Sequence, residues 1–368
     1  MRAMLRRVPI ALRALGLAVL LGVTATALLL WWRPLMEFEA EYVVFGTHAR
    51  VRLLALDPAQ AEAALAQAGQ QLAADHRSWH AWEPSDLTAL NADLAAGRSR
   101  QVDPALANLV REAKRGHALS DGLFNPAAGK LIRAWGFHTS EYPVRTAAPA
   151  DDELARLQAN PPTMKNVHVS AQGEVRSDNP LVQLDLNALA EGYAAKQLRG
   201  MLEQRRIENA LLDIGGLIMA IGDDRGQPWQ VGVRGPDGAI GHVLLQDGET
   251  LSSSGDYQRR RANPGKAEGH IIDTARGRPQ QRSAAATIIS HDPVLADMAG
   301  TTLMVAGPER FDVLAHRMGL RCAMLLTHDG RLLATPTMQR RLKLRAGYHF
   351  QLPSTAPAGA QAGDPPHC

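Results

Sequence analysis

The sequence predicts an α+β fold, with mixed or antiparallel sheets and packed helices, preceded by one N-terminal transmembrane helix. Short apolar segments separated by turn residues occur in runs, and isolated helical stretches interrupt them. Strands in runs with helices between them are typical of α+β folds rather than of doubly wound parallel sheets. We therefore expect a membrane anchor or signal segment over residues 1–35, one domain over 36–350 and a disordered tail over 351–368.

The N-terminal segment places four arginines ahead of an uncharged, apolar run over residues 14–32. These 19 residues are enough to cross a bilayer core as a helix, and the Trp31-Trp32 pair that ends the run is typical of the membrane interface. The alternative is a cleaved signal peptide, but the small residues Ala25 and Ala27 lie inside the run rather than after it. We expect a single-pass anchor in the inner (cytoplasmic) membrane, with the remaining chain on the periplasmic side.

The charge of the body argues against a nucleic-acid-binding surface. The whole chain has a net charge of +3, but residues 1–33 contain five arginines and no acidic residue. Residues 34–368 alone therefore carry a net charge of −2. A nearly neutral domain lacks the basic patch that nucleic acids require.

Cysteine usage predicts no obligatory structural disulfide. Cys322 and Cys368 are the only cysteines, and Cys368 ends the Pro- and Ala-rich tail. Because this tail is expected to be disordered, an obligatory structural disulfide between the two is not expected.

The secondary structure follows from periodicity and from helix start signals. Residues 41–56 alternate apolar and polar side chains over much of their length and are expected to form two strands, or one long bent strand, around Gly46. Capping residues, three of them in Asp-Pro pairs, predict helices over about 57–77, 103–119, 187–206 and 294–305. Apolar runs between turn residues predict strands over 210–214, 217–221, 229–233, 242–246, 286–290, 322–326 and 331–335.

Common catalytic motifs are missing from the sequence. It contains no P-loop, no GxGxxG after a strand, no CxxC, no HExxH and no GxSxG, which removes the usual nucleotide-binding, zinc-protease and serine-hydrolase functions. Four polar clusters in apolar, glycine-containing segments remain as candidates for chemistry.

The first cluster is the segment 120–126 (SDGLFNP), followed by Trp135-Gly136-Phe137. A turn with exposed backbone amides beside aromatic side chains could hold a planar ring. The alternative is an ordinary junction between a helix and a loop.

The second cluster is the segment 184–193 (LDLNALAEGY). If Asp185 leaves a strand and Asn187 caps the following helix, then Asp185, the backbone of Ala188 and Glu191 gather near a helix N-terminus, which suits anionic or polar ligand groups. Capping alone would explain Asn187. Gly192 in the first turns costs about 1 kcal/mol of helix stability and therefore predicts that something approaches the backbone closely.

The third cluster combines segment 251–257 (LSSSGDY) with His270 and Asp273. The serine run could be a plain turn. His270, beside two β-branched residues, is placed like a base at the end of a strand, although a lone histidine is more often structural.

The fourth cluster lies on the helix that begins at Asp292-Pro293. Asp297 and Thr301 are four residues apart and so share one face of this apolar helix. A carboxylate and a hydroxyl stacked in this way offer a site for a hard cation such as Mg²⁺. The alternative is that Asp297 binds a neighbouring loop while Thr301 bonds back to its own helix.

Taken together and in this order, these segments resemble the FAD:protein FMN transferase family, also called ApbE-like. The resemblance covers about residues 40–345, and the conjunction of segments is what makes it specific. The segments are FGTHARVRL (45–53), WHAWEPSDLTALN (79–91), SDGLFNPAAG (120–129), LDLNALAEGYA (184–194), LLDIGG (211–216), SSSGDY (252–257), HIIDTARGRP (270–279) and ADMAGTTLMVAG (296–307).

The resemblance implies a mixed fold and a Mg²⁺-dependent reaction in which the FAD diphosphate is cleaved and FMN passes to a Ser or Thr of an acceptor flavoprotein. It implies Mg²⁺ ligands at Asp297, Thr301 and the backbone carbonyl of Ala188. The flavin contacts that it implies are Phe45, Trp82, Leu123, Phe124, Asn125, Asp185, Glu191 and Ile272. We take His270 and Asp256 as candidates for deprotonating the acceptor hydroxyl.

The sequence also departs from the family pattern. The family often has Met where this chain has Phe45, Asp where it has Asn125, Lys where it has Glu191 and Pro where it has Thr274. The changes at Phe45, Asn125 and Glu191 affect expected contacts with the flavin ring more than metal binding. The change at Thr274 is a variation in a turn.

Two other functions fit the same residues. A Mg²⁺-dependent FAD pyrophosphatase would use the same site with water in place of the acceptor hydroxyl. A non-catalytic flavin-binding protein tethered to the membrane would not need the Asp297 and Thr301 pair. The expected acceptor is a membrane or exported electron-transfer flavoprotein, as the expected location of the chain and the resemblance to the family imply.

Overall fold

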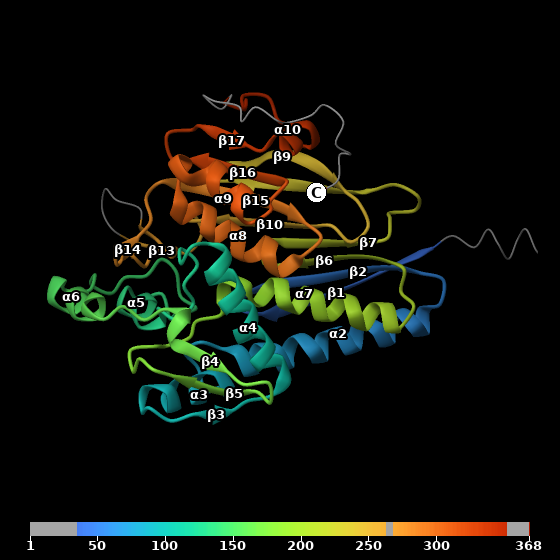
Figure 1. The fold of residues 1–368 in the computed structure, drawn as a ribbon. Helices are drawn as coiled ribbons and strands as arrows, with labels where there is room; N and C mark the ends of the chain where they lie inside the picture. Colours follow the sequence, from blue (N-terminus) through green and yellow to red (C-terminus); the bar gives the residue numbers. More distant parts are fainter. Residues whose placement is uncertain (1–34, 263–267, 352–367) are drawn as a thin grey trace, which may run out of the picture.

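The computed structural model describes residues 35–262, 268–351 and 368, and its centre is an eight-stranded antiparallel sheet (Figure 1). The expected N-terminal transmembrane helix and nearly all of the expected disordered tail lie outside these residues. Within them, no helix is both long and apolar enough to span a bilayer. The strands of the sheet are, in spatial order, β1 (Met36–Val44), β2 (Thr47–Ala55), β6 (Asn209–Ile214), β7 (Leu217–Ile221), β10 (Thr250–Gly255), β15 (Ser283–Ser290), β16 (Cys322–Thr327) and β17 (Leu332–Ala334).

The hairpin of β1 and β2 confirms that residues 41–56 form two strands around Gly46. Val44 pairs with Thr47, so only Phe45 and Gly46 form the turn. Their φ values are 54° and 69°. Positive φ at both central residues is typical of the tight turns whose twist matches that of the paired strands.

Helices α2, α7 and α8 cover one face of the sheet, and β8, β9 and β18, together with α10, cover part of the other. The helices are α2 (Pro58–Trp79), α3 (Asp86–Ala95), α4 (Pro104–Leu119), α5 (Gly129–Ala134), α6 (Asp151–Ala159), α7 (Asn187–Gln204), α8 (Pro293–Ala306), α9 (Phe311–Arg317) and α10 (Pro336–Arg341). The small sheets are β8 (Trp229–Gly235), β9 (Gly238–Leu245) and β18 (Lys343–Leu344); β3 (Arg100–Gln101), β5 (Glu174–Ser177) and β4 (Val167–Val169); β11 (Arg260–Arg261) and β12 (Glu268–Gly269); and β13 (Ile272–Asp273) and β14 (Arg278–Pro279). Two short 3₁₀ turns span Met164–Asn166 and Pro308–Arg310.

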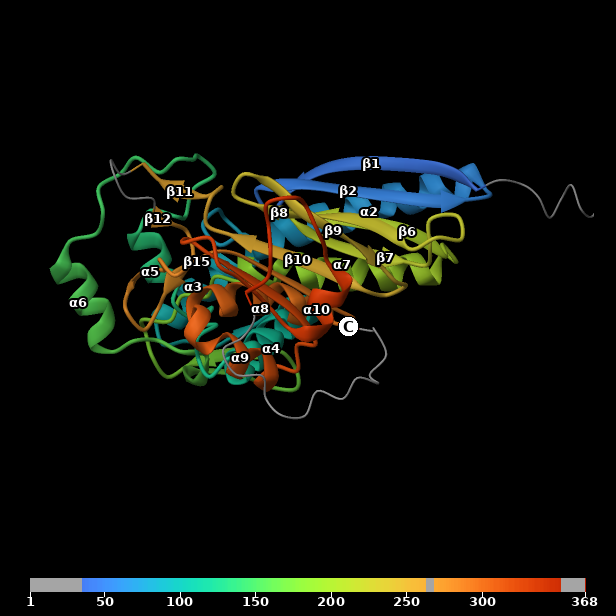
Figure 2. The same ribbon diagram turned by 90° about the horizontal axis from the view of Figure 1, so that it is seen from above.

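Alternation along the central strands explains why both faces of the sheet are covered. On β2, Val51 and Leu53 face the core under α2 and α7, whereas Leu54 belongs to the core shared with β8 and β9. Successive side chains of a strand point to opposite faces, so a strand buried on both sides needs a layer on each. Figure 2 shows β8 and β9 as a separate pair of strands beside the large sheet.

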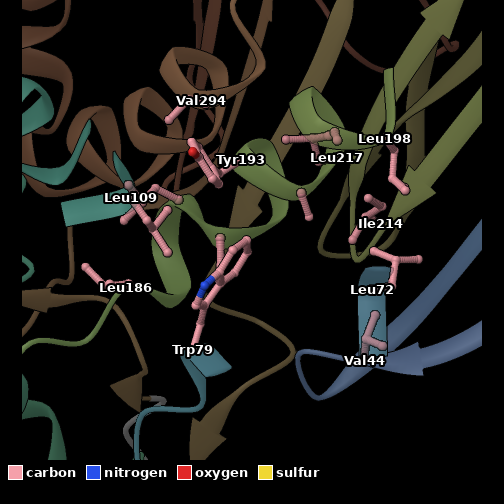
Figure 3. Close-up of a cluster of buried hydrophobic side chains, with 14 of the residues drawn as sticks. Val44, Leu72, Trp79, Leu109, Leu186, Tyr193, Leu198, Ile214, Leu217 and Val294 are labelled. Carbon is pink, nitrogen blue, oxygen red and sulfur yellow. The ribbon is translucent and has the colours of Figure 1, made fainter. Parts of the chain in front are cut away.

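Side chains from different helices fill the core on the helical face. Trp79 of α2 and Tyr193 of α7 meet edge to face, with their ring centroids 5.7 Å apart. Leu109 of α4 and Val294 of α8 lie in the same cluster (Figure 3). This core fixes α7 and α8 relative to each other, and those two helices carry the candidate metal ligands.

Three aspartates cap helices as predicted, whereas the prediction for Asn187 was wrong. Asp57 accepts a hydrogen bond from Ala59 N, Asp103 accepts from Ala105 N and Leu106 N, and Asp292 caps α8 in the same manner. Asn187 is instead the first residue of α7, and Leu186 precedes it without a side-chain cap. Asp185 takes over the capping role, since its Oδ1 accepts a hydrogen bond from Asn187 N at 3.1 Å.

Two further features differ from the expectations. The serine run at 252–254 belongs to β10 in the middle of the large sheet, because neighbouring strands pair with it on both sides, and so it is not a plain turn. Helix α3, which the sequence patterns did not reveal, begins with a reciprocal capping arrangement between Ser85 and Thr88.

A disulfide joins Cys322 to Cys368, so the expectation of no obligatory structural disulfide was wrong. Their Cα atoms are 5.4 Å apart. Cys322 is fully buried in β16, and Arg341 Nη1 donates a hydrogen bond to Cys368 Sγ at 2.8 Å. Arg341 is itself held by the buried carboxylate of Glu249. Cys368 is therefore held by specific contacts with Cys322 and Arg341, which the composition of the tail could not reveal.

We expect Cys368→Ser to lower the free energy of unfolding by about 2–4 kcal/mol, because the bond restricts the unfolded chain over 46 residues. Thermal unfolding with and without a thiol reductant measures this effect. The reductant should lower the melting temperature of the wild type and leave that of Cys368→Ser unchanged. Equal melting temperatures for all four samples would contradict a stabilising disulfide.

Candidate active site

A cavity of about 270 Å³ brings together 11 of the 13 predicted site residues. The residues that reach it are Trp82, Leu123, Phe124, Asn125, Asp185, Ala188, Glu191, His270, Ile272, Asp297 and Thr301. Phe45 and Asp256 are not among its lining residues. A more open groove of about 480 Å³ lies where the end of α2 meets the starts of α3 and α4, and it contains none of the predicted residues.

One end of the cavity is formed where α7 and α8 cross closely. Asp297 Oδ2 accepts a hydrogen bond from Gly192 N at 2.9 Å. A Cβ atom at position 192 would lie 2.9 Å from the carbonyl carbon of Pro293 and 3.0 Å from Asp297 Cβ. The prediction that something approaches the backbone at Gly192 is therefore confirmed, and the approaching element is α8.

Thr301 and Thr302 are adjacent on α8 but use their hydroxyls differently. Thr302 Oγ1 donates to Met298 O at 2.9 Å within its own helix. Thr301 lines the cavity, and its hydroxyl makes no hydrogen bond within the part of the chain that the structure describes. The alternative in which Thr301 bonds back to its helix is thus not observed, and its oxygen is available to a ligand.

Glu191, which is half-buried, and Asp297, which is buried, are neighbouring carboxyl residues in this part of the cavity. Burial raises the pKa of Glu191, and the neighbouring charge of Asp297 raises it further. Burial also raises the pKa of Asp297, against the opposing effect of the hydrogen bond from Gly192. Two acidic groups that repel each other in a buried site favour a cation near them.

The glycine pair of segment 211–216 determines where Glu191 lies. Gly215, in the turn between β6 and β7, has a φ of 66°. A Cβ atom at this position would clash with the Glu191 carboxylate. The turn therefore requires glycine for two reasons, its backbone conformation and the close approach of Glu191.

Aromatic side chains form another part of the cavity lining. Trp82 stacks on His138 with ring centroids 5.5 Å apart and an interplanar angle of 22°. His138 Nε2 donates to Asp185 Oδ2 at 3.1 Å, and both side chains are buried. The 120–126 turn is fixed by Ser120, whose Oγ accepts a hydrogen bond from Phe124 N, and by His117, whose Nδ1 lies 2.9 Å from Phe124 O. A planar ring could stack in such a rigid apolar setting.

Phe45 lies behind the cavity and supports it. Its ring stacks on Trp79 at 6.0 Å, and its backbone N donates to His76 Nδ1 at 3.1 Å. The two residues that follow it, Gly46 and Thr47, line the cavity. Phe45 thus holds the hairpin turn against α2, while Gly46 and Thr47 face the cavity.

His270 is the candidate base that the cavity does contain. The residue is half-buried, and its Nδ1, which is fully buried, has no hydrogen-bond partner among the described residues. Burial lowers the pKa of His270 to about 4, and the positive charge of Arg259 contributes to the decrease. The ring is therefore neutral at pH 7 and can accept a proton or a hydrogen bond.

Asp256 is directed away from the cavity into a separate network. Its Oδ2 accepts hydrogen bonds from Gln280 Nε2 at 3.2 Å and from His328 Nε2 at 2.9 Å. These bonds connect β10 to the turn between β16 and β17, so Asp256 has a structural task in this arrangement.

The ion pair of Asp256 and His328 predicts a pH-dependent contribution to stability. The hydrogen bond that His328 donates to Asp256 raises the pKa of His328 above its usual value of about 6.5. A raised folded pKa stabilises the fold fully below the unfolded value, and this contribution is lost as pH rises through the folded value. NMR titration should place the pKa of His328 above 6.5 in the wild type and lower in Asp256→Asn. A pKa for His328 that does not change in Asp256→Asn would contradict the pairing.

Sequence patterns missed three polar residues that belong to this site. Arg259 and Tyr142 line the cavity, and His138 pairs with Asp185. Arg259 follows the SSSGDY segment by two residues, and His138 follows directly after Trp135-Gly136-Phe137. Only their positions next to segments that had been assigned to the site could have identified them from the sequence.

Known proteins resemble this chain over most of its length. The family model described as the ApbE family matches residues 45–324. A FAD:protein FMN transferase from Rhodobacter capsulatus is 38% identical over 90% of this chain, which spans 64% of that protein's length. A second FAD:protein FMN transferase, from Salmonella typhimurium, is 28% identical over 76% of this chain and 82% of its own length.

Solved structures show the same arrangement of elements. The crystal structure of the ApbE protein from Thermotoga maritima matches with a TM-score of 0.75 at 26% identity, covering 84% of this chain and 100% of that one. The apo flavinyl transferase ApbE from Pseudomonas stutzeri matches with a TM-score of 0.72 at 25% identity, covering 83% and 96% of the two chains. The match to these structures confirms the predicted α+β class with antiparallel sheets.

Proposed function

The chain belongs to the ApbE family, as its ordered segments indicated, and on this premise we propose that it transfers FMN from FAD to a protein hydroxyl and releases AMP. The observation that carries the proposal is the meeting of two kinds of surface in one cavity. Carboxyl groups and a threonine hydroxyl line one part of the cavity, and aromatic side chains line another. A flavin ring and a diphosphate need these two environments at the same time.

We propose Mg²⁺ as the cofactor, held by Asp297, Thr301 and the carbonyl of Ala188. These are hard oxygen donors, and Mg²⁺ keeps several waters, so few protein ligands are sufficient. The described residues contain no group of three or more His, Cys, Asp or Glu side chains that could hold a metal, which is compatible with one carboxylate supplemented by neutral oxygens. When bound, Mg²⁺ would neutralise diphosphate charge and act as a Lewis acid.

The proposed reaction is a displacement at phosphorus. The oxygen of an acceptor Ser or Thr forms a bond to the FMN phosphorus, and the bond from that phosphorus to the bridging oxygen breaks. The bridging oxygen leaves with AMP, and the hydroxyl proton leaves the acceptor. Atoms and charges balance without an oxidant or a reductant.

His270 would receive the acceptor proton or orient the hydroxyl that loses it. The ring lines the cavity with an unpartnered Nδ1, and burial keeps it neutral. A neutral imidazole has a free lone pair that can accept a proton as the new bond to phosphorus forms. Asp256, in contrast, would act only through the elements that it holds together.

We propose that the N-terminal segment anchors the chain in the inner membrane with the domain on the periplasmic side. The apolar run over residues 14–32 supports this location. The Cys322–Cys368 bond also supports export, because disulfides persist in oxidising compartments. An acceptor reachable from there would be a membrane or exported electron-transfer flavoprotein.

A transfer assay tests the proposed function. Purified full-length chain is incubated with FAD, with Mg²⁺ or EDTA, and with or without an acceptor domain whose flavinylated residue is a threonine. We expect AMP release and in-gel flavin fluorescence of the acceptor, both requiring Mg²⁺. The matched control is the same acceptor with valine in place of that threonine, which should remain dark.

Each other outcome assigns a different function. AMP release that does not depend on the acceptor, with no labelled protein, would mean that the chain is an FAD pyrophosphatase. FAD binding with neither product would mean that it is a flavin carrier. Either result would overturn the transferase proposal.

A further inference from the structure

Arg259 is the only arginine or lysine among the described residues that line the cavity. Its side chain is half-buried and has no ion-pair partner in the part of the chain that the structure describes. Its Nη2 donates to Phe45 O and to Gly46 O, both at 3.3 Å. These two distances are long for hydrogen bonds donated by a guanidinium group, and Nε and Nη1 make no hydrogen bond with the residues that the structure describes.

Arg259 borders the cavity next to the turn between β1 and β2, since its Nη2 contacts Phe45 O and Gly46 O. Burial has the largest effect on the pKa of Glu191, His270 and Tyr142, and the charge of Arg259 acts on all three. It opposes the rise for Glu191 and Tyr142 and adds to the decrease for His270. The charge of Arg259 therefore acts both on a carboxyl residue of the lining, Glu191, and on an aromatic one, Tyr142.

The charge balance of the cavity leaves Arg259 available for an anion. The lining contains three carboxyl groups, Asp185, Glu191 and Asp297. Asp185 is engaged by His138 and by the start of α7, and Asp297 is engaged by Gly192. None of the three forms a salt bridge with Arg259 within the described chain. A guanidinium fork that is not saturated by carboxylates matches the paired oxygens of a phosphate.

We propose that Arg259 binds the diphosphate of FAD and thereby makes the site select FAD over flavins that lack a diphosphate. The inference rests on the proposed function, since it takes FAD as the ligand. Because Arg259 also contacts the carbonyls of Phe45 and Gly46, it would hold the hairpin turn next to the bound diphosphate. It is a specificity-determining residue and is separate from the ligands proposed for Mg²⁺.

Flavin binding by the full-length chain in the presence of Mg²⁺ tests this role without measuring turnover. Fluorescence quenching gives the dissociation constants of FAD and riboflavin for the wild type, Arg259→Gln and Arg259→Lys. We expect Arg259→Gln to weaken FAD binding by about tenfold to a hundredfold, the range for a lost hydrogen bond to a charged group. Riboflavin binding should stay within about twofold, and Arg259→Lys should fall between the wild type and Arg259→Gln for FAD.

The neighbouring arginine supplies the matched control. Arg260 is exposed, is absent from the cavity lining and pairs through its backbone with Gly269. Arg260→Gln removes the same charge one residue away and should bind both flavins as the wild type does. Melting temperatures of all variants report whether the fold is intact.

The outcomes separate this inference from the proposed function. Equal loss of FAD and riboflavin affinity in Arg259→Gln, or unchanged FAD affinity, would overturn the role of Arg259 and leave the transferase proposal standing. A wild type that binds no FAD would overturn both. Selective loss of FAD affinity in an enzyme that transfers no FMN would support Arg259 and reject the transferase.

Discussion

Asp297→Asn is expected to lower Mg²⁺-dependent FMN transfer by about a thousandfold, the scale of several kcal/mol of lost charge stabilisation. Asparagine has nearly the same shape, and its amide oxygen can still accept the hydrogen bond that Gly192 N donates to Asp297 Oδ2 at 2.9 Å. The substitution therefore removes the charge and keeps the packing between α7 and α8. The measurement is kcat/KM for FAD at several Mg²⁺ concentrations, with melting temperatures to confirm the fold.

A pair of threonine variants serves as the control for the same helix. Thr301→Val removes a hydroxyl that faces the cavity, whereas Thr302→Val removes one that donates to Met298 O. Both changes replace a hydroxyl by a methyl group of similar size. Thr301→Val should raise the Mg²⁺ concentration required for half-maximal rate, and Thr302→Val should leave it unchanged. An Asp297→Asn enzyme with the wild-type rate at ordinary Mg²⁺ would place the metal elsewhere.

The sequence predicted those structural features that depend only on neighbouring residues. The turn at Gly46 and the caps at Asp57 and Asp103 depend only on residues within a few positions, and all three are observed. The shared face of Asp297 and Thr301 follows from helical spacing, and both reach the cavity. The resemblance to a known family extended this to side chains that lie far apart in the chain.

Features that depend on distant partners escaped prediction. Cys368 is held by Cys322 and Arg341, which lie in β16 and α10. The serine run is a strand because β7 and β15 pair with it on both sides. Asp256 leaves the site because Gln280 and His328 bind its carboxylate. None of these partners can be identified from the neighbouring sequence.

The contact at Gly192 connects the fold to the chemistry, so Gly192→Ala should damage both. A Cβ atom there would lie 2.9 Å from the carbonyl carbon of Pro293 and 3.0 Å from Asp297 Cβ. The atoms that it meets belong to the backbone of α8 and to the base of a short side chain, so rotamer changes cannot relieve the overlap. Alanine gains about 1 kcal/mol of helix propensity over glycine, but overpacking costs about 1–3 kcal/mol or more.

Gly200, in the same helix, separates propensity from packing. A Cβ atom at Gly200 meets nothing within 4 Å, so Gly200→Ala should raise the free energy of unfolding by up to about 1 kcal/mol. Gly192→Ala should lower it by about 2 kcal/mol and reduce transfer by about a hundredfold, because α8 must move and carries Asp297 with it. Chemical denaturation and kcat/KM measure the two effects.

If both variants were equally stabilised, α7 and α8 would have room to separate, and the position of Asp297 would not depend on the glycine. If Gly192→Ala lost stability but kept its rate, the metal site would tolerate a shift of α8, and Asp297 would not be the ligand that determines the geometry.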